Sequence, residues 1–359
     1  MTKHVRHIQI FSFVMTVIAV QLLTRMTGTE YFLTQLTMSA YYSLVVIGLS
    51  LLMGYAGQIS IGHAGFFAIG GYMSSFLTTY NLLPYGDNSL VALLSESGIL
   101  VQRQDLYGAS LVTVHPWIAC ITAVIVTLVI AYIVGGPVLR LKGHYLAMAT
   151  LGLGIIIYRI AIGTPLFGAA DGLSDVPPFA LIPGIEVSGR MSVRVLNYYI
   201  AWALVVICML LLLNLVHSRI GRALRSIHSA EDASNAMGVN TAKYKLHTFV
   251  LSAVMASVAG VMLAHYNGGI GPSEASVMKS VRYVAIVAIG GMANLWGALI
   301  MAVLLNFLSL RGYFGSMDDA VFGCILIIIM LFAPYGILRL EMFRDLIKKV
   351  RHKGEAEQA

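Results

Sequence analysis

The sequence predicts an all-α polytopic membrane protein with about ten membrane passes, helices broken by glycines, and both termini in the cytoplasm. The first observation is composition: of 359 residues, 58% are apolar and 11% are charged, whereas soluble domains carry about 25% charged residues. The second is the recurrence of apolar runs close to the ~20 residues that a helix needs to cross a bilayer. The third is that Lys and Arg concentrate in a few of the polar segments between these runs, as expected for cytoplasmic loops.

The first apolar run, 8–23, follows Lys3 and Arg6, an arrangement that resembles the charged and apolar regions of a signal peptide. No small-residue cleavage site follows the run, only Thr24 and Arg25. We therefore expect an uncleaved first helix.

The next apolar block, 41–80, is rich in small residues at regular spacing. They form two neighbouring stripes, one of Ala56, Ser60, Ala64 and Ala68 and one of Gly54, Gly62 and Gly70. One interpretation is close helix packing, which in lipid depends on small residues. The other is that the glycines break the helix at membrane depth, which is tolerated only where the break is buried in protein or lines an aqueous cavity.

Three residues of this block are candidates for a substrate path: Gln58, Gly62 and His63. Gln58 and His63 are polar within an apolar block, and polar groups inside a bilayer are functional candidates. The alternative for His63 is a hydrogen-bonded packing residue. No acidic residue lies nearby in the sequence to make it part of a proton relay.

Polar loops and further spans alternate after this block. Residues 81–116 are polar, and the expected spans that follow are 117–134, 144–162 and 197–217. The segment 167–179 is a cluster of glycines and prolines that cannot form a helix.

The loop 218–247 is polar and separates two long apolar runs. It predicts a short helix over 230–237, with Ser229 as N-cap, Asp232 as its reciprocal capping partner and Gly238 as a left-handed stop. A helix of about two turns is marginal in water unless its own domain or a partner holds it. It is therefore either a docking element or an ordinary capped loop helix.

The last expected spans are 248–266, 281–310 and 321–338. Glycines interrupt the second of them around Asn294, which is a further candidate for the path. Two glycine-interrupted blocks, one in each half of a chain, are typical of transporters built from repeated halves with the path between them.

Most Lys and Arg residues fall in the N-terminal segment and in 135–143, 218–247 and 339–359, which we assign to the cytoplasm. An even number of crossings must separate the last two, so 281–310 has to cross twice. Because it is too short for two full spans, we expect two short helices turning near 291–294. The positive charge thus reflects orientation rather than nucleic acid binding.

Five stretches carry a resemblance that extends over most of the chain. They are LSLLMGYAGQISIGHAGFFAIGGY, LRLKGHYLAMATLGLG, ADGLSDVPP, GRALRSIHSAEDASNAMGVNTAKYKLHTFVLSAVMASVAG and AIGGMANLWGAL. Together they resemble the bacterial ABC-transporter permeases for branched-chain amino acids, of the LivM type. The resemblance runs from about Tyr41 to Leu338.

The resemblance implies a multi-pass permease of the bacterial inner membrane that moves branched-chain or related hydrophobic amino acids, using ATP hydrolysis by partner subunits. It implies as partners a homologous permease of the LivH type, two cytoplasmic ATPase subunits, a periplasmic substrate-binding protein and membrane lipid, and no nucleic acid. It makes 1–338 the transmembrane permease domain, with 218–247 as its cytoplasmic coupling loop, and 339–359 a basic cytoplasmic tail.

The resemblance also assigns the coupling element. In this family an E-A-A…G loop couples the permease to its ATPase, and the matching residues here are Glu231, Asp232, Ala233 and Gly238. The core reads Glu-Asp-Ala, so the motif is imperfect, but a short helix and its glycine stop are retained.

Two departures from the family pattern bear on the substrate. Ile155 follows Gly154 where many relatives have an acidic residue, and Ala169 and Ala170 precede Asp171 where many have two glycines. Relatives of this type also carry urea, short amides or aromatic acids, which are the alternative substrates.

The chain lacks the motifs of an enzyme. It has no G-x-x-x-x-G-K-[ST] and no H-E-x-x-H or other ligand cluster, so we expect a transport subunit without cofactor or metal. Its cysteines, Cys120, Cys208 and Cys324, lie in apolar runs, which disfavours disulfides and zinc sites. The competing class is an ion-coupled secondary transporter, which would place carboxylates at mid-membrane, whereas we expect every Asp and Glu here in a loop or tail.

Overall fold

The computed structural model describes residues 3–85, 95, 97–104, 108, 110–313 and 315–332. This part is mostly helical, and six of its helices are long and apolar enough to cross a membrane. The basic tail 339–359 and the end of the expected span 321–338 lie outside the described residues. The helices of the bundle are α1 (Lys3–Met26), α2 (Phe32–Ala56), α3 (His63–Thr79), α5 (Pro116–Val138), α6 (His144–Gly163), α7 (Arg194–His217), α10 (Thr241–Asn267), α11 (Val277–Gly290), α12 (Leu295–Leu310) and α13 (Asp318–Phe332).

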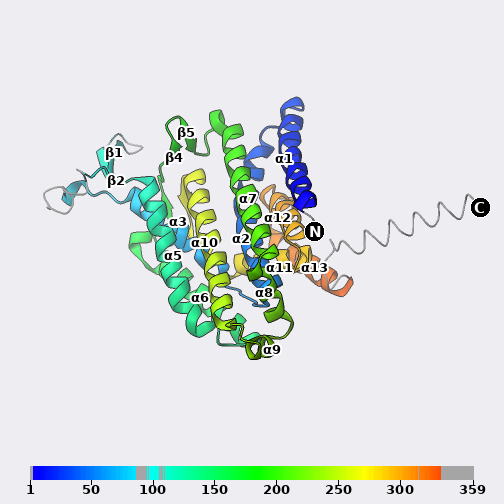
Figure 1. Ribbon diagram of the computed structural model, residues 1–359. Coiled ribbons are helices and arrows are strands. Elements are labelled where there is room, and N and C mark those ends of the chain that lie inside the picture. Colours follow the sequence, from blue (N-terminus) through cyan, green and yellow to red (C-terminus); the bar gives the residue numbers. More distant parts are fainter. Residues whose placement is uncertain are drawn as a thin grey trace, which may run out of the picture.

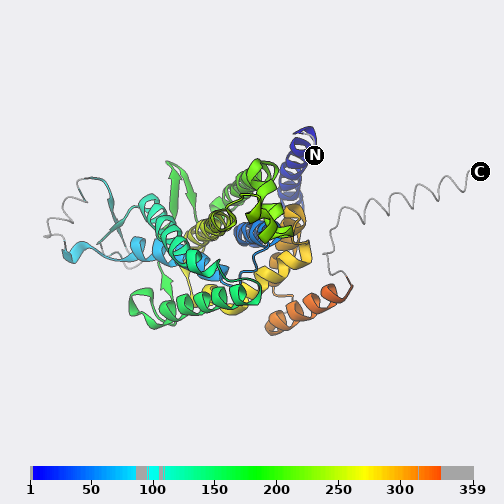
Figure 2. The same cartoon turned by 60° about the horizontal axis from the view of Figure 1, so that its bottom comes forward.

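Helix α2 lies in the middle of the bundle (Figure 1). It packs against α7, α10, α11 and α12, and every residue from Ser39 to Ala56 is buried. A helix surrounded by protein is apolar on all sides, which explains why this run shows no polar face. Helix α1 and the strands β1 (Leu100–Gln104) and β2 (Ser110–Val114) lie at opposite ends of the molecule, as the view in Figure 2 confirms.

The block 41–80 contains two helices rather than one. Helix α2 ends at Ala56 and α3 begins at His63. Gly57 follows α2 in the left-handed conformation, with φ 67°, and its N–H donates to the Leu52 carbonyl, which closes the helix end. Residues 57–62, called the 57–62 turn below, are not helical.

The block 281–310 contains the pair α11 and α12, joined by residues 291–294, called the 291–294 turn below. At 1.5 Å per residue the two helices are about 21 and 24 Å long, shorter than the ~30 Å hydrocarbon core. Helix α12 returns to the level at which α2 begins, since the ring of Phe307 lies 5.8 Å from that of Phe32 and Arg311 lies 4.6 Å over the Phe32 ring.

The all-α expectation is wrong in one respect, because the described part contains three small antiparallel sheets of two strands each. They are short and lie in the connections at one end of the bundle, so hydropathy alone did not reveal them. Their strands are β1 (Leu100–Gln104) with β2 (Ser110–Val114), β3 (Leu173–Ser174) with β6 (Gly269–Ile270), and β4 (Phe179–Ile182) with β5 (Ile185–Val187).

The loop 218–247 contains more helix than expected. Helix α8 (Arg219–Ser229) precedes the short helix α9 (Glu231–Ala236). Helix α8 buries Leu224 and Ile227 and contacts α2, α7 and α10. The loop is therefore a pair of helices docked on the bundle rather than one isolated helix.

The predicted capping box of α9 is wrong. Ser229 belongs to α8, and its hydroxyl donates to the Arg225 carbonyl at 3.0 Å. The N-cap of α9 is Ala230, and no side chain of the described residues caps it. The glycine stop is present, because Gly238 has φ 85°.

Small residues bring α3 and α10 into backbone contact. An ideal Cβ on Gly70 would lie 2.2 Å from the Ser257 carbonyl oxygen, and one on Gly260 would lie 2.0 Å from that of Phe67. Both distances are far below van der Waals contact, so neither position has room for a side chain. The small-residue stripe of the sequence therefore includes close helix contacts of the kind that stabilise membrane bundles.

Candidate functional site

Three segments meet at the C-terminal end of α2. The 291–294 turn lies against Gly54, where an ideal Cβ would be 1.6 Å from the Met292 carbonyl oxygen. The Tyr55 hydroxyl donates to the Ala293 carbonyl at 2.8 Å, and the Ser50 hydroxyl donates to the Met292 carbonyl at 3.2 Å. The two glycine-interrupted blocks of the sequence therefore lie next to each other in space, and we call this region, residues 54–63 and 291–294, the α2 junction.

Helix α8 touches the same junction from the side of α9. An ideal Cβ on Gly57 would lie 2.7 Å from Nδ1 of His228. Gly57 is also the left-handed residue that ends α2, so its conformation favours glycine, and a side chain there would displace the His228 ring. A displacement of α8 would therefore act directly on the end of α2.

Helix α6 holds the other end of the 57–62 turn. The Ile61 N–H donates to Oγ1 of Thr150 at 3.0 Å, and an ideal Cβ on Gly62 would lie 2.4 Å from the Thr150 carbonyl oxygen. Gly62 is the N-cap residue of α3. The predicted path residue Gly62 thus lies where the α3 backbone touches α6.

His63 lies inside the bundle with both ring nitrogens bonded. Nδ1 is 3.0 Å from Oγ of Ser60, and Nε2 is 2.8 Å from Oγ of Ser252. The ring is 1% exposed and meets Phe66 and Phe249 edge to face. This geometry is that of a hydrogen-bonded packing residue, which links the 57–62 turn to α10.

Gln58 differs from His63 in having no such bonds. Its side chain is 1% exposed, and neither its amide oxygen nor its amide nitrogen finds a hydrogen-bond partner among the residues that the structure describes. A buried amide without partners costs about 1–3 kcal/mol. This makes Gln58 the member of the junction whose side chain is least satisfied in the present conformation.

Asn294 caps α12. Its Oδ1 accepts a hydrogen bond from the Gly297 N–H at 3.1 Å, and Asn294 N–H donates to the Gly291 carbonyl at 2.9 Å. These bonds satisfy backbone groups that a helix start leaves open. Asn294 thus joins Gln58, Gly62 and His63 at the α2 junction, and the use of all four in a substrate path stays a prediction.

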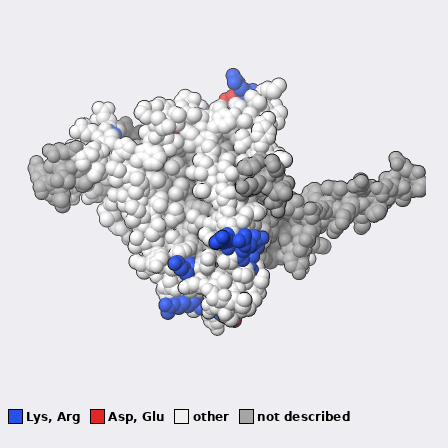
Figure 3. All heavy atoms as spheres, in the orientation of Figure 1, with Lys and Arg blue, Asp and Glu red and all other residues white. Residues whose placement is uncertain are grey.

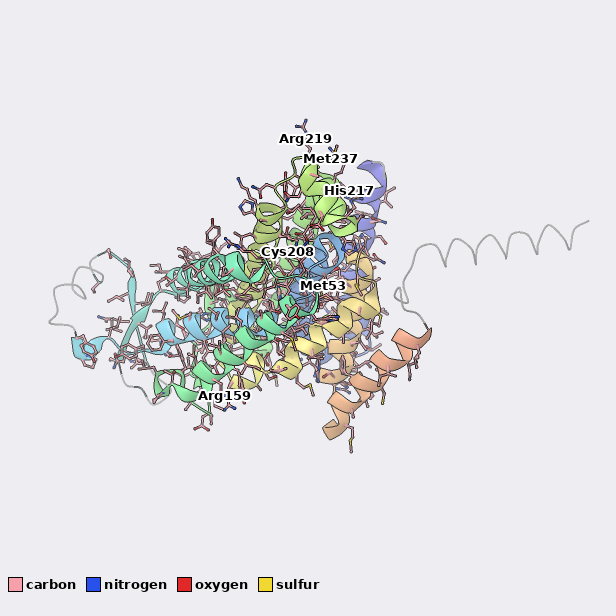
Figure 4. The ribbon with its side chains drawn as sticks, turned by 90° about the horizontal axis from the view of Figure 1, so that it is seen from below. Met53, Arg159, Cys208, His217, Arg219 and Met237 are labelled. Atoms are coloured by element: carbon pink, nitrogen blue, oxygen red, sulfur yellow. The ribbon has the colours of Figure 1, made fainter. Side chains whose placement is uncertain are left out.

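Helix α9 presents an exposed face at the end of the molecule. Asp232, Ala233 and Gly238 are exposed, and Met237 is 86% exposed, whereas Glu231 points inward, 2.5 Å from Nζ of the buried Lys245 on α10. Arg219 and Met237 lie in this α8–α9 region, away from Arg159 on α6 (Figure 4). The four residues assigned to coupling therefore have two different roles in the structure.

An exposed ion pair joins α9 to the connection between α5 and α6. Nζ of Lys142 lies 2.8 Å from Oδ1 of Asp232. The hydrogen bond and charge of Lys142 lower the pKa of Asp232, and Asp232 raises the pKa of Lys142. The pair loses its stabilising effect only when pH falls through the lowered carboxyl pKa or rises through the raised ammonium pKa, so it persists at neutral pH.

One ion pair inside the bundle escaped the sequence analysis. Glu274, in a 3-10 turn before α11, lies 3.0 Å from Nζ of Lys279 and accepts a hydrogen bond from the Tyr42 hydroxyl at 3.0 Å. Tyr42 is about 15 Å along α2 from Phe32, so the connection that carries Glu274 reaches into the bundle, although Glu274 lies in a loop, as expected. The Gly-Pro-Ser sequence before Glu274 is typical of a surface turn, so the sequence did not indicate that Glu274 contacts α2.

The described residues contain no group of three or more His, Cys, Asp or Glu that could hold a metal ion. What they contain is a bundle of membrane helices with two interrupted segments in contact and a helix pair docked at one end. These features define a multi-pass transmembrane permease subunit.

The comparisons identify the family. The profile described as "Branched-chain amino acid transport system / permease component" matches residues 31–332, so the chain belongs to this family of ABC-importer permeases of the bacterial inner membrane. No solved structure matches the chain.

Among its relatives, the high-affinity branched-chain amino acid transport system permease protein LivM of Salmonella typhimurium is 27% identical over 340 residues, covering 89% of this chain and 72% of the relative. LivM of Escherichia coli is 27% identical over 344 residues, covering 90% and 73%. The permease protein LivH of Escherichia coli is 26% identical over 322 residues, covering 86% and 96%. The similarity to LivM supports the LivM type that the sequence motifs indicated.

The unsatisfied amide of Gln58 generates a prediction about the transport cycle. We expect Gln58→Leu to raise the midpoint of thermal unfolding, because it removes a buried polar group without partners. The substitution should also lower the rate of uptake, because leucine has no polar group that could form a hydrogen bond in another conformation. Thermal unfolding of the purified protein and uptake in proteoliposomes measure the two effects.

The matched control is Gln21→Leu. Gln21 is also buried, but its Oε1 accepts a hydrogen bond from the Tyr199 hydroxyl at 3.1 Å, so this substitution should lower the unfolding midpoint. Equal destabilisation by both substitutions would show that Gln58 is satisfied and would contradict the proposed role.

Proposed function

We propose that the chain is the transmembrane permease subunit of an ABC importer that moves branched-chain or related hydrophobic amino acids across the inner membrane. The family match over residues 31–332 carries this proposal. The similarity of the chain to permease subunits of such importers suggests as partners a homologous permease, two ATPase subunits and a periplasmic binding protein. Urea, short amides and aromatic acids are the alternative substrates, because Ile155, Ala169 and Ala170 depart from the family pattern.

We further propose ten passes with both termini in the cytoplasm and helices broken by glycines at membrane depth. The bundle helices α1, α2, α3, α5, α6, α7, α10, α11, α12 and α13 supply the passes, with α11 and α12 as the short pair. Lys and Arg gather at the end formed by α8, α9 and the start of α10, while the flank above is almost free of charge (Figure 3). A basic end next to an apolar belt supports the cytoplasmic assignment of 218–247.

The proposed coupling element is the pair α8–α9. The exposed face of α9, with Asp232, Ala233 and Met237, is free to meet an ATPase subunit, while Glu231 fixes α9 to α10 through Lys245. Helix α8 connects this face to Gly57 through His228. A push on α9 would then reach the α2 junction through rigid helices, and the four candidate path residues lie there.

Glu274 favours a second candidate function, an ion-coupled secondary transporter, because it places a carboxylate within the helix bundle. The two functions differ in the energy source for uptake. With the cognate binding protein and ATPase subunits in proteoliposomes, we expect leucine, isoleucine and valine uptake that requires ATP inside the vesicle and survives collapse of the ion gradients by ionophores. Uptake that stops with ionophores but not without ATP would favour the secondary transporter, and uptake of urea, a short amide or an aromatic acid instead would change the substrate.

The proposed topology predicts the accessibility of two positions. In a variant without its natural cysteines, Ser174→Cys should react with an impermeant maleimide in intact spheroplasts, and Met237→Cys only after permeabilisation. Both side chains are exposed, whereas Ser234 at the middle of α9 is 7% exposed and cannot report on either side. Labelling of Met237→Cys in intact spheroplasts would reverse the orientation.

The proposed coupling role predicts the effect of Gly238→Val. Gly238 has φ 85°, where a β-branched side chain costs about 1–2 kcal/mol, so the end of α9 should distort. We expect weaker co-purification of the ATPase subunits and lower binding-protein-stimulated ATP hydrolysis and uptake. Pull-down and coupled ATPase assays measure these effects.

Gly184→Val is the matched control. Gly184 also has a positive φ, 88°, and open space around an added Cβ, but it lies in the β4–β5 turn, on the side assigned to the periplasm. It should leave ATPase binding unchanged. If Gly238→Val keeps ATPase binding and stimulated hydrolysis at the control level while uptake falls, α9 is not the coupling element.

A further inference from the structure

A cavity of about 370 Å³ opens between α5 and the first turns of α10, beside α9. Helix α5 lines it with Tyr132 and Gly136, and α10 lines it with Lys243 and His247. Arg140, just after α5, completes the lining on the side of α9. The cavity therefore lies at the end of the bundle where Lys and Arg gather (Figure 3).

The charge around this cavity is positive. Arg140, Lys243 and His247 are exposed, and none of the three has an ion-pair partner within the described part of the chain. Glu231 also lines the cavity, but its carboxylate lies 2.5 Å from Nζ of Lys245 and is neutralised there. An anion in the cavity would thus meet two permanent positive charges and a histidine.

An apolar track leads from the cavity along the outside of α5. Ile125, Val129 and Tyr132 are 54%, 45% and 55% exposed, and with Gly136 they follow one another at the three- and four-residue spacing of a helix face. Helix α5 is one of the helices apolar and long enough to cross a membrane. The cavity therefore has a polar floor at the level of the headgroups and an open side that continues into the lipid-facing surface.

We propose that this cavity binds the headgroup of an anionic phospholipid such as phosphatidylglycerol. Arg140 and Lys243 contact the phosphate, and an acyl chain lies along the exposed face of α5. Clusters of basic residues between membrane helices on the cytoplasmic side suit such headgroups. A lipid in this position bridges α5 and α10 next to the Glu231–Lys245 pair that holds α9.

The test uses the full-length chain purified in a neutral detergent and titrated with phosphatidylglycerol, with bound lipid counted by native mass spectrometry. Arg140→Gln and Lys243→Gln should each weaken binding about fivefold, the effect of roughly one interfacial charge. Arg219→Gln is the charge-matched control, because Arg219 is exposed on α8 and does not line the cavity. Equal weakening by Arg219→Gln would overturn the site in favour of diffuse surface attraction.

Gly136→Leu tests the cavity without changing a charge. An added Cβ at Gly136 meets no atom within 4 Å, so a leucine can enter the cavity without displacing backbone, and we expect it to reduce lipid binding at least tenfold. Gly152→Leu on α6, where a Cβ also meets nothing within 4 Å, is the matched control and should bind lipid normally. Unchanged binding by Gly136→Leu with an unfolding midpoint like that of the control would overturn the proposal.

Two further binding measurements distinguish a lipid phosphate from free inorganic phosphate. Phosphatidylcholine should bind at least fivefold more weakly than phosphatidylglycerol, and inorganic phosphate at equal concentration should not displace the bound lipid, because it lacks the acyl chains that occupy the α5 face. Displacement by inorganic phosphate would make this a site for free anions, and equal binding of phosphatidylcholine would remove the role of charge; either result overturns the lipid site.

Discussion

The structure depends on the need to satisfy backbone hydrogen-bonding groups where helices stop inside the bundle. In lipid an unpaired N–H or carbonyl costs several kcal/mol, so interrupted helices survive only when protein supplies the partners. Gln58 N–H donates to the Leu52 carbonyl, Ile61 N–H to the Thr150 hydroxyl, and Ala64 N–H to the Ser280 hydroxyl. These partners come from α2, α6 and α11, so the 57–62 turn and the start of α3 depend on the helices packed around them.

The α2 junction is stiff because its segments contact one another directly at glycines, which have no side chain. Gly54 lets the 291–294 turn lie directly on the α2 backbone, and Gly57 lets His228 of α8 do the same one turn later. A displacement of one helix is transmitted through these hydrogen-bonded turns to the next helix, because packed interiors rearrange between discrete states rather than deform continuously. Gln58 directly follows the second of these contacts and has no side-chain partners among the described residues, so the least stabilised group of the junction lies next to the point at which α8 meets α2.

Local patterns in the sequence predicted most of the long helices, while the docked helix α8, the small sheets and the contacts between distant residues could not be predicted. The glycine-rich stretches indicated where α2 and α11 end, since a missing side chain is visible in sequence. The partners of His63 and Glu231 are Ser252 and Lys245 on α10. The sequence around His63 and Glu231 gives no indication of either partner. The predicted capping box was wrong because α8 extends to Ser229, whose hydroxyl donates to the Arg225 carbonyl in the preceding turn. This bond competes with capping of α9, and a short motif does not show which of the two forms.

The pair Glu274–Lys279 shows how a charge within the helix bundle can have a structural role. An isolated carboxylate there would be costly and would favour binding a proton or a metal cation, as coupling in secondary transporters requires. Here its oxygens lie 3.0 and 3.1 Å from the Lys279 ammonium, and the same ammonium lies 4.4 Å over the ring of Tyr42. A carboxylate already neutralised in this way has little to gain from a cation. Glu274 therefore fixes the start of α11 to α2, which is consistent with a permease whose energy comes from outside the membrane.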